Sequence, residues 1–165
     1  MSNSKESNSK IDRSNWDAGP WDSEPDQTQW TDESTGLECR TDRNAIGAWC
    51  GYVGIPSTHP LYQKHYDEVH RLYPDFEIHC GLTFGGPQAE VLSRDKDLWW
   101  FGFDCSHRYD YSPGRVGILR DTKRPDAIDL ASQISGRQAS TTYRTLEYVQ
   151  AECAALAKFL AGVTS

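Results

Sequence analysis

The sequence predicts an α+β fold: a small, mostly antiparallel sheet with one C-terminal helix packed on one face and long irregular connections. Two observations carry this prediction. Short segments rich in aromatic and β-branched residues, separated by Gly and Pro, are typical of strands. One long segment near the C-terminus has apolar residues at helical spacing. The length of 165 residues is that of one domain.

Residues 1–36 are predicted to be a disordered acidic leader, and residues 37–165 to form a single α+β domain. The leader holds eight acidic and three basic side chains, so it accounts for most of the net charge of -7. It offers little apolar surface to offset the entropy of ordering it. Its tryptophans, at positions 16, 21 and 30, leave two interpretations open. They pack loosely on the domain, or they belong to a segment that folds onto a partner or onto the domain's own pocket.

Four segments of the domain are predicted to be strands, because each is apolar or aromatic and ends near a turn-forming residue. They cover residues 37–41, 47–55, 75–84 and 98–104. Pro60 and Pro74 bracket a stretch that is compatible with a short helix. Residues 108–140, which are interrupted by prolines and glycines, are expected to form a long irregular excursion over one face.

A helix is predicted over residues 143–160. Thr141 or Thr142 is the expected N-cap, and Gly162 stands where the helix should stop. A narrow apolar stripe follows one face of this helix and must be buried, with the sheet as its partner. The stripe consists of Leu146, Val149, Cys153, Leu156 and Leu160.

Strand parity predicts a small-molecule pocket on the sheet face opposite this helix. Alternate side chains of a strand point to opposite faces, so the aliphatic positions lie under the helix and the polar ones face away from it. Convergent polar groups among aromatics and glycines are typical of a ligand pocket. The pair Tyr52 and Trp100 is expected to stack on a flat ring. The expected ligand-binding residues are Tyr52, Glu77, His79, Thr83, Trp100, Asp104, His107, Asp110 and Arg144.

The same alternation of side chains along a strand bears on whether the histidines and cysteines form a metal site. In a strand, His79 and Cys80 point in opposite directions, and Cys80 and Cys105 fall on apolar faces, where a thiol acts as a small hydrophobe. The paired ligand spacing of structural zinc sites is also missing. The sequence therefore predicts no metal and no cofactor. His79 and His107 are the candidate catalytic residues, as general acid or base.

Composition narrows the class of partner. The sequence has no run of 18 apolar residues for a membrane span and no basic run for nucleic-acid phosphates. The N-terminal segment MSNSKESNSK lacks the apolar core of a signal peptide. The five cysteines are odd in number and widely spaced, which indicates reduced thiols rather than a disulfide framework. These features predict a cytoplasmic protein with a small-molecule ligand, no nucleic-acid partner and no membrane contact. Assembly into a homo-oligomer stays open.

Four segments together resemble a family of small uncharacterised proteins of phages, prophages and bacterial genomes. The segments are AWCGYVGIPSTHPLY, HCGLTFGG, WWFGFDCSHRYDYSPG and YRTLEYVQAECAALAKFL. Members of that family commonly have a second glycine at the position of Cys80. The resemblance implies a phage-type protein of the host cytosol.

From this resemblance we expect a ligand-binding protein that sequesters a nucleotide-like signalling molecule of host defence. His79, His107 or Arg144 would meet its phosphate, and Asp104 and Glu77 would accept hydrogen bonds from the ribose or base. One alternative is a hydrolase or lyase that acts on such a nucleotide. Another is a protein-binding inhibitor of a host factor.

Overall fold

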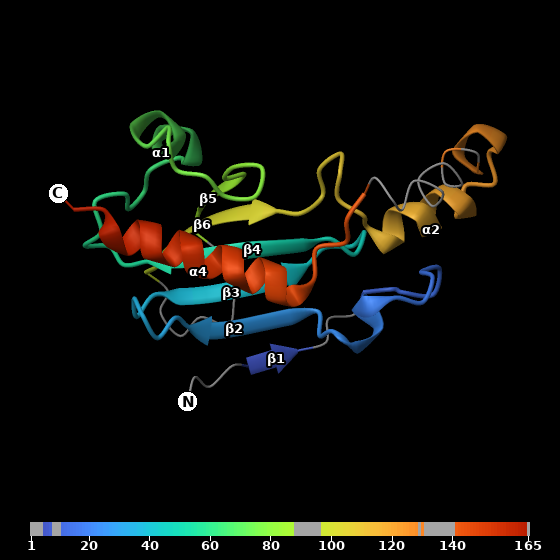
Figure 1. The fold of residues 1–165 in the computed structure, drawn as a ribbon, viewed down its shortest axis with the longest axis horizontal. Coiled ribbons are helices and arrows are strands. Elements are labelled where there is room, and N and C mark those ends of the chain that lie inside the picture. Colours follow the sequence, from blue (N-terminus) through green and yellow to red (C-terminus); the bar gives the residue numbers. More distant parts are fainter. Residues whose placement is uncertain (1–4, 8–10, 88–96, 129, 131–140, 165) are drawn as a thin grey trace.

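The computed structural model describes residues 5–7, 11–87, 97–128, 130 and 141–164. Its centre is a six-stranded sheet in the order β1-β2-β3-β4-β6-β5, with every neighbouring pair antiparallel (Figure 1). This confirms the predicted α+β class. The strands are β1 (Lys5–Ser7), β2 (Gln27–Thr31), β3 (Glu38–Arg43), β4 (Trp49–Ile55), β5 (Phe84–Gly86) and β6 (Trp99–Asp104).

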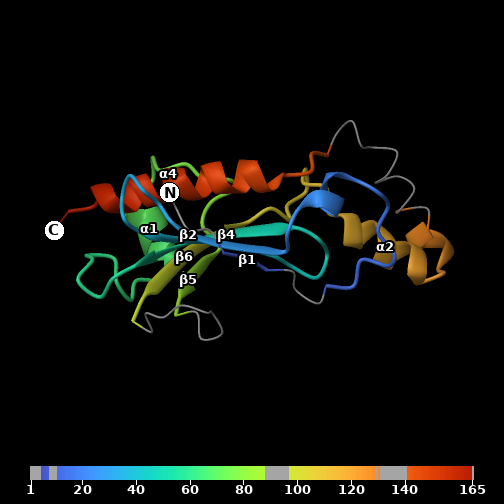
Figure 2. The same ribbon diagram turned by 90° about the horizontal axis from the view of Figure 1, so that it is seen from below.

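The C-terminal helix α4 (Leu146–Gly162) covers one face of the sheet, as predicted, and packs on β3 and β4 (Figures 1 and 2). Its stripe is fully buried at Val149, Cys153, Leu156 and Leu160. The backbone of β4 comes close at Gly51, where a Cβ atom would lie 2.8 Å from Cys153 Sγ. The N-cap is Thr145, whose side chain accepts from the Tyr148 N–H, rather than Thr141 or Thr142.

The helices α1 and α2 lie in the connections. The helix α1 (Tyr66–Leu72) falls inside the predicted proline bracket, and His65 is its N-cap. The helix α2 (Pro113–Asp121) corrects the expectation of an irregular excursion over residues 108–140. Proline at the first helical position is favourable there, because its missing N–H has no partner to lose. Of the same excursion, residues 129 and 131–140 lie outside the described residues.

The strand predicted over residues 75–84 is wrong except at its end. Of the predicted range only its last residue, Phe84, lies in a strand, which is β5 and pairs with β6. A turn occupies the centre of the predicted strand, where the Gly81 N–H donates to Ile78 O at 2.9 Å. Cys80 and Gly81 both have positive φ, 51° and 88°. The alternation of apolar residues arises differently: Ile78 and Leu82 enter the core from the two sides of this turn. Cys80, expected among apolar groups, is exposed.

The described part of the predicted leader is folded, which corrects the expectation of disorder. Trp21 is 3% exposed and stacks on Tyr111, with ring centroids 5.5 Å apart. Residues 11–23 lie beside α2 at one end of the sheet in both views (Figures 1 and 2). Strand β2 then pairs with β3 along its whole length.

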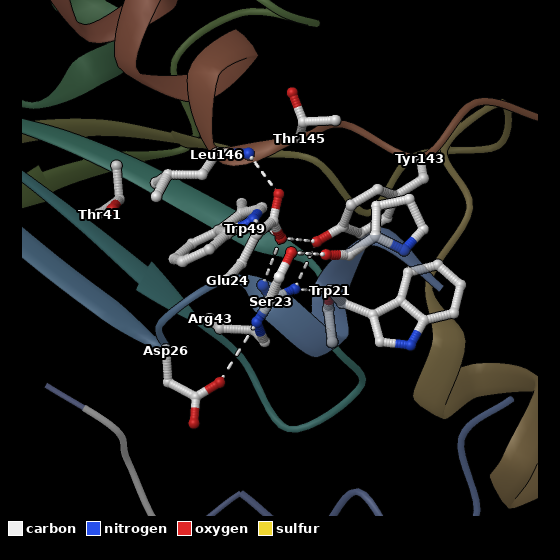
Figure 3. A network of polar contacts seen from close by, with 12 residues as sticks. Trp21, Ser23, Glu24, Asp26, Thr41, Arg43, Trp49, Tyr143, Thr145 and Leu146 are labelled. Atoms are coloured by element: carbon white, nitrogen blue, oxygen red, sulfur yellow. Dashed lines mark hydrogen bonds and ion pairs between the residues drawn. The ribbon is translucent and has the colours of Figure 1, made fainter. Parts of the chain in front are cut away.

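Glu24 fastens this segment to three other elements (Figure 3). Its Oε2 accepts from Arg43 Nη2 at 2.6 Å, from Trp49 Nε1 at 3.3 Å and from the Tyr143 hydroxyl. Its Oε1 accepts from the Leu146 N–H at 2.9 Å. We call these five residues the Glu24 network. The charged hydrogen bonds of the Glu24 network are partly buried and offset part of the ordering entropy of this segment, which could not be foreseen from composition.

Among the described residues, no helix has both the length and the apolar character needed to cross a bilayer.

Candidate functional site

The carboxylate of Asp110 is buried and contacts residues from three other parts of the chain. Its Oδ2 lies 2.9 Å from His79 Nε2 and accepts from the His107 N–H at 3.1 Å, while Oδ1 accepts from Arg144 Nε at 2.9 Å. Only 2% of its side chain is exposed. With Tyr148, which contacts His79, these residues form what we call the Asp110 cluster.

The backbone around Asp110 is fixed on both sides. The loop after β6 runs beside the approach to α4, where the Tyr111 N–H donates to Thr142 O at 2.9 Å and the Thr142 N–H donates to Tyr109 O at 2.8 Å. The cluster therefore lies where the end of β6, the turn at residues 78–81 and the N-terminal part of α4 meet. Because backbone bonds hold two of these segments together, the side chains are positioned without a ligand.

His79 is the buried member of the cluster, with 5% of its side chain exposed. Its Nδ1 lies 3.0 Å from the Tyr148 hydroxyl, and its backbone N–H donates to Glu152 Oε2 at 2.8 Å. An ionised Asp110 accepts only, so Nε2 carries the proton and Nδ1 accepts from Tyr148. Both ring nitrogens are occupied, so a ligand can bind His79 directly only by displacing Tyr148 from Nδ1 or Asp110 from Nε2.

His107 is the accessible imidazole, with 32% of its side chain exposed. Its Nδ1 lies 3.5 Å from Asp110 Oδ2 and 4.0 Å from Asp104 Oδ1, and among the described residues it completes no hydrogen bond. Asp104 is itself held by Thr83 Oγ1, which donates to it at 3.0 Å, and by the Ser106 N–H. Because Nδ1 faces two carboxylates, Nε2 is the nitrogen of His107 that a ligand would meet.

The carboxylates of the site are stabilised as anions. Burial raises the pKa of Asp110, but the hydrogen bonds, chiefly those from Arg144 and His79, lower it by more. The net pKa of Asp110 therefore lies below its usual value. The pKa of Asp104 is also low, because the hydrogen bonds from Ser106 and Thr83 outweigh its burial. Burial lowers the pKa of Arg144, but the hydrogen bond to Asp110 and the charges of the neighbouring groups together outweigh it, so the net pKa is raised. At neutral pH both acids are therefore acceptors.

Six of the nine predicted site residues meet in or beside the Asp110 cluster. They are His79, Thr83, Asp104, His107, Asp110 and Arg144. Glu77 is exposed and takes no part in the hydrogen bonds that join them. Trp100 is 1% exposed, and Tyr52 packs edge-on against Phe84 with ring centroids 5.6 Å apart. The two rings are thus already packed, and the expected stacking pair is not available to a ligand.

Tyr148 and Glu152 were not predicted as site residues. They are one helical turn apart on α4, each one position before a residue of the buried stripe, Val149 and Cys153. A tyrosine and a glutamate at i and i+4 beside a buried stripe are the signal that marks them in the sequence. Cys80 was set aside because the predicted strand pointed it away from His79.

One group of side chains in this region has the composition of a metal site. The potential ligand atoms of His79, Cys80 and His107 all lie within 4.8 Å of one another. The turn at Cys80 and Gly81 makes this approach possible, since it replaces the strand in which His79 and Cys80 would diverge.

Comparison of the chain with protein-family models, with curated proteins and with solved structures finds no match in any of the three.

Proposed function

We propose that the Asp110 cluster binds a small phosphorylated molecule of nucleotide type and acts on it as a hydrolase or lyase, with His107 as the general acid or base. The observation that carries this proposal is the position of His107, whose Nδ1 faces the carboxylates of Asp110 and Asp104 while a third of the side chain is exposed. Carboxylates that face Nδ1 favour the tautomer with its proton on that nitrogen, which leaves Nε2 for proton transfer.

Arg144 supplies the phosphate contact. Its Nε donates to Asp110, its guanidinium lies 4.8 Å from the centre of the Tyr148 ring, and 26% of the side chain is exposed. Both contacts hold the guanidinium plane in one orientation. A planar guanidinium held in this way presents its Nη groups as a fork that matches phosphate oxygens.

The hydrolytic step follows from these two residues. A water oxygen forms a bond to phosphorus while His107 Nε2 takes the proton of that water. The bond from phosphorus to the leaving oxygen breaks with its electron pair on that oxygen, which then receives the proton from His107. Arg144 faces the phosphate oxygens on which negative charge develops. General acid–base catalysis of this kind contributes roughly 10²–10⁴-fold in rate.

Sequestration without turnover is the second candidate function. It is favoured by the mutual hydrogen bonds of the cluster, which fix its side chains before any ligand arrives and so lower the entropy cost of binding. The resemblance to phage-associated proteins points to a signalling nucleotide of host defence as the ligand. A protein-binding inhibitor that contacts its target through the leader has less support, because Trp21 of the leader is buried in the fold and is not exposed to a partner.

The test is incubation of the full chain with cyclic and linear adenine and guanine nucleotides, followed by heat release and mass spectrometry of the released molecules. A changed nucleotide supports the enzyme, and an intact one supports sequestration. Absence of binding at micromolar protein contradicts both.

Two variants of histidine sharpen this experiment. In His107→Ala, turnover should fall at least about 100-fold while binding persists. The matched control is His65→Ser, which changes an exposed histidine at the N-cap of α1 and keeps a capping side chain there. Equal turnover in His107→Ala and His65→Ser would remove His107 from the mechanism.

A further inference from the structure

We propose that His79, Cys80 and His107 form a binding site for a divalent transition metal, with zinc as the best match to the ligand set. Two imidazoles and one thiolate are ligands that zinc prefers, and three protein ligands leave a fourth position for water or substrate. The potential ligand atoms lie within 4.8 Å of one another.

The turn at residues 78–81 is what brings two neighbouring residues to one centre. Cys80 adopts φ 51°, a left-handed conformation that side chains other than glycine rarely take. Residues held in such conformations are enriched at functional sites, where the surroundings compensate their cost. The thiol is exposed and His107 is partly exposed, so an ion can reach the site from solvent.

Asp110 has the position of the outer carboxylate that commonly supports metal-bound histidines. Its Oδ2 lies 2.9 Å from His79 Nε2, where it holds that ring, and faces His107 Nδ1 at 3.5 Å. The nitrogens that remain for a metal are therefore His79 Nδ1 and His107 Nε2.

The charge around the site favours a cation. Asp104 and Asp110 approach His107, and Glu152 Oε2 accepts from the His79 N–H. Within this group of contacts Arg144 is the balancing cation, bound to Asp110. Three carboxylates and one guanidinium leave a net negative charge, which a divalent ion would neutralise.

Tyr148 competes with the metal for one ligand atom. Its hydroxyl occupies His79 Nδ1 at 3.0 Å, and a metal that binds through this nitrogen must displace it. Removal of the hydroxyl in Tyr148→Phe should therefore leave metal affinity unchanged or increase it. A fall in metal affinity in this variant would count against His79 Nδ1 as a ligand atom.

The experiment titrates the chelator-treated full chain with Zn²⁺ and with Co²⁺, in the absence of any nucleotide. We expect one ion per chain and, with Co²⁺, the near-ultraviolet charge-transfer band of a thiolate ligand. Cys80→Ser should abolish that band and weaken binding at least about tenfold, and His107→Ala should weaken binding similarly. The matched control Cys50→Ser, at a half-buried thiol outside the group, should change neither.

Protection of a thiol gives a second measurement. Zn²⁺ should slow alkylation of Cys80 in the folded chain. A chain that is folded by circular dichroism and takes up no stoichiometric metal would overturn the proposal, as would binding that Cys80→Ser and His107→Ala leave unchanged. A metal on His107 Nε2 would occupy the nitrogen that the proposed function uses for proton transfer, so the two proposals are alternatives at this residue. Nucleotide turnover measured in the presence of a chelator, separately from metal binding, distinguishes the failure of one from the failure of the other.

Discussion

Glu24 Oε1 accepts a hydrogen bond at 2.9 Å from the N–H of Leu146, the first residue of α4, 122 positions later in the chain. The other oxygen of Glu24 pairs with Arg43, whose side chain is 0% exposed. In Glu24→Ala, Arg43 keeps Asp26 at 3.3 Å as its remaining carboxylate partner, but the Leu146 N–H loses its acceptor. We expect a loss of about 3 kcal/mol in the free energy of unfolding, measured by urea denaturation.

The control for this prediction is Glu77→Ala, which removes an exposed acid outside the Glu24 network. Its free energy of unfolding should stay within about 0.5 kcal/mol of the native chain. Similar small losses in both variants would mean that the contacts of Glu24 contribute little to the stability of the fold.

The sequence predicted those parts of the fold that rest on local periodicity. The stripe from Leu146 to Leu160 and the alternation in β4 and β6 each match one element geometry, and parity placed Gly51 under α4 and Asp104 away from it. The folding of the leader could not be predicted in this way. It depends on the pairing of β2 with β3 and on the contacts of Glu24 with distant residues, which hydropathy does not record.

The sequence predicted which residues belong to the candidate site better than it predicted the backbone geometry that brings them together. His79 and Asp104 were expected together on one sheet face, and both lie beside His107, but His79 reaches the site from a turn and not from a strand. The apolar residues Ile78 and Leu82 are spaced equally well for either geometry. Only the tertiary contacts with α4 decide between them, and they also bring in Tyr148.

Arg144→Ala should weaken the binding of a phosphorylated ligand about 10- to 100-fold, since a charged hydrogen bond contributes about 1.5–3 kcal/mol. The measurement is the dissociation constant for whichever nucleotide the binding screen identifies. The matched control is Arg115→Ala, because Arg115 lies in α2 and donates to Ser106 O outside the Asp110 cluster. Equal weakening by both substitutions would count against a specific phosphate contact by Arg144.

One of the five thiols should react in the folded chain, and all five after unfolding. Cys80 is exposed, whereas Cys39, Cys105 and Cys153 are buried. Burial raises the pKa of Cys39 and of the half-buried Cys50 to about 12, so almost no thiolate of either exists near pH 8.

A chromogenic disulfide reagent at pH about 8 measures this count, with Cys80→Ser as the control that should show no reactive thiol before unfolding. Burial and the charge of Asp110 also raise the pKa of Cys80, so its reaction should be slower than that of a free cysteine. Two or more fast thiols in the folded chain would contradict the burial of the others.

Alkaline pH should destabilise the fold through Tyr52. Burial raises the pKa of this phenol above its usual value of about 10, because the folded chain disfavours the charged form. A raised pKa means that the contribution to stability is complete below the unfolded pKa and is lost as the pH rises towards the folded one. Above pH 10 the free energy of unfolding should therefore fall, by up to about 1.4 kcal/mol per pH unit for each such group.

Urea denaturation at a series of pH values should show a flatter decline for Tyr52→Phe and an unchanged decline for Tyr109→Phe, whose ring is 64% exposed. Identical slopes in the two variants would show that Tyr52 is not held neutral by the fold.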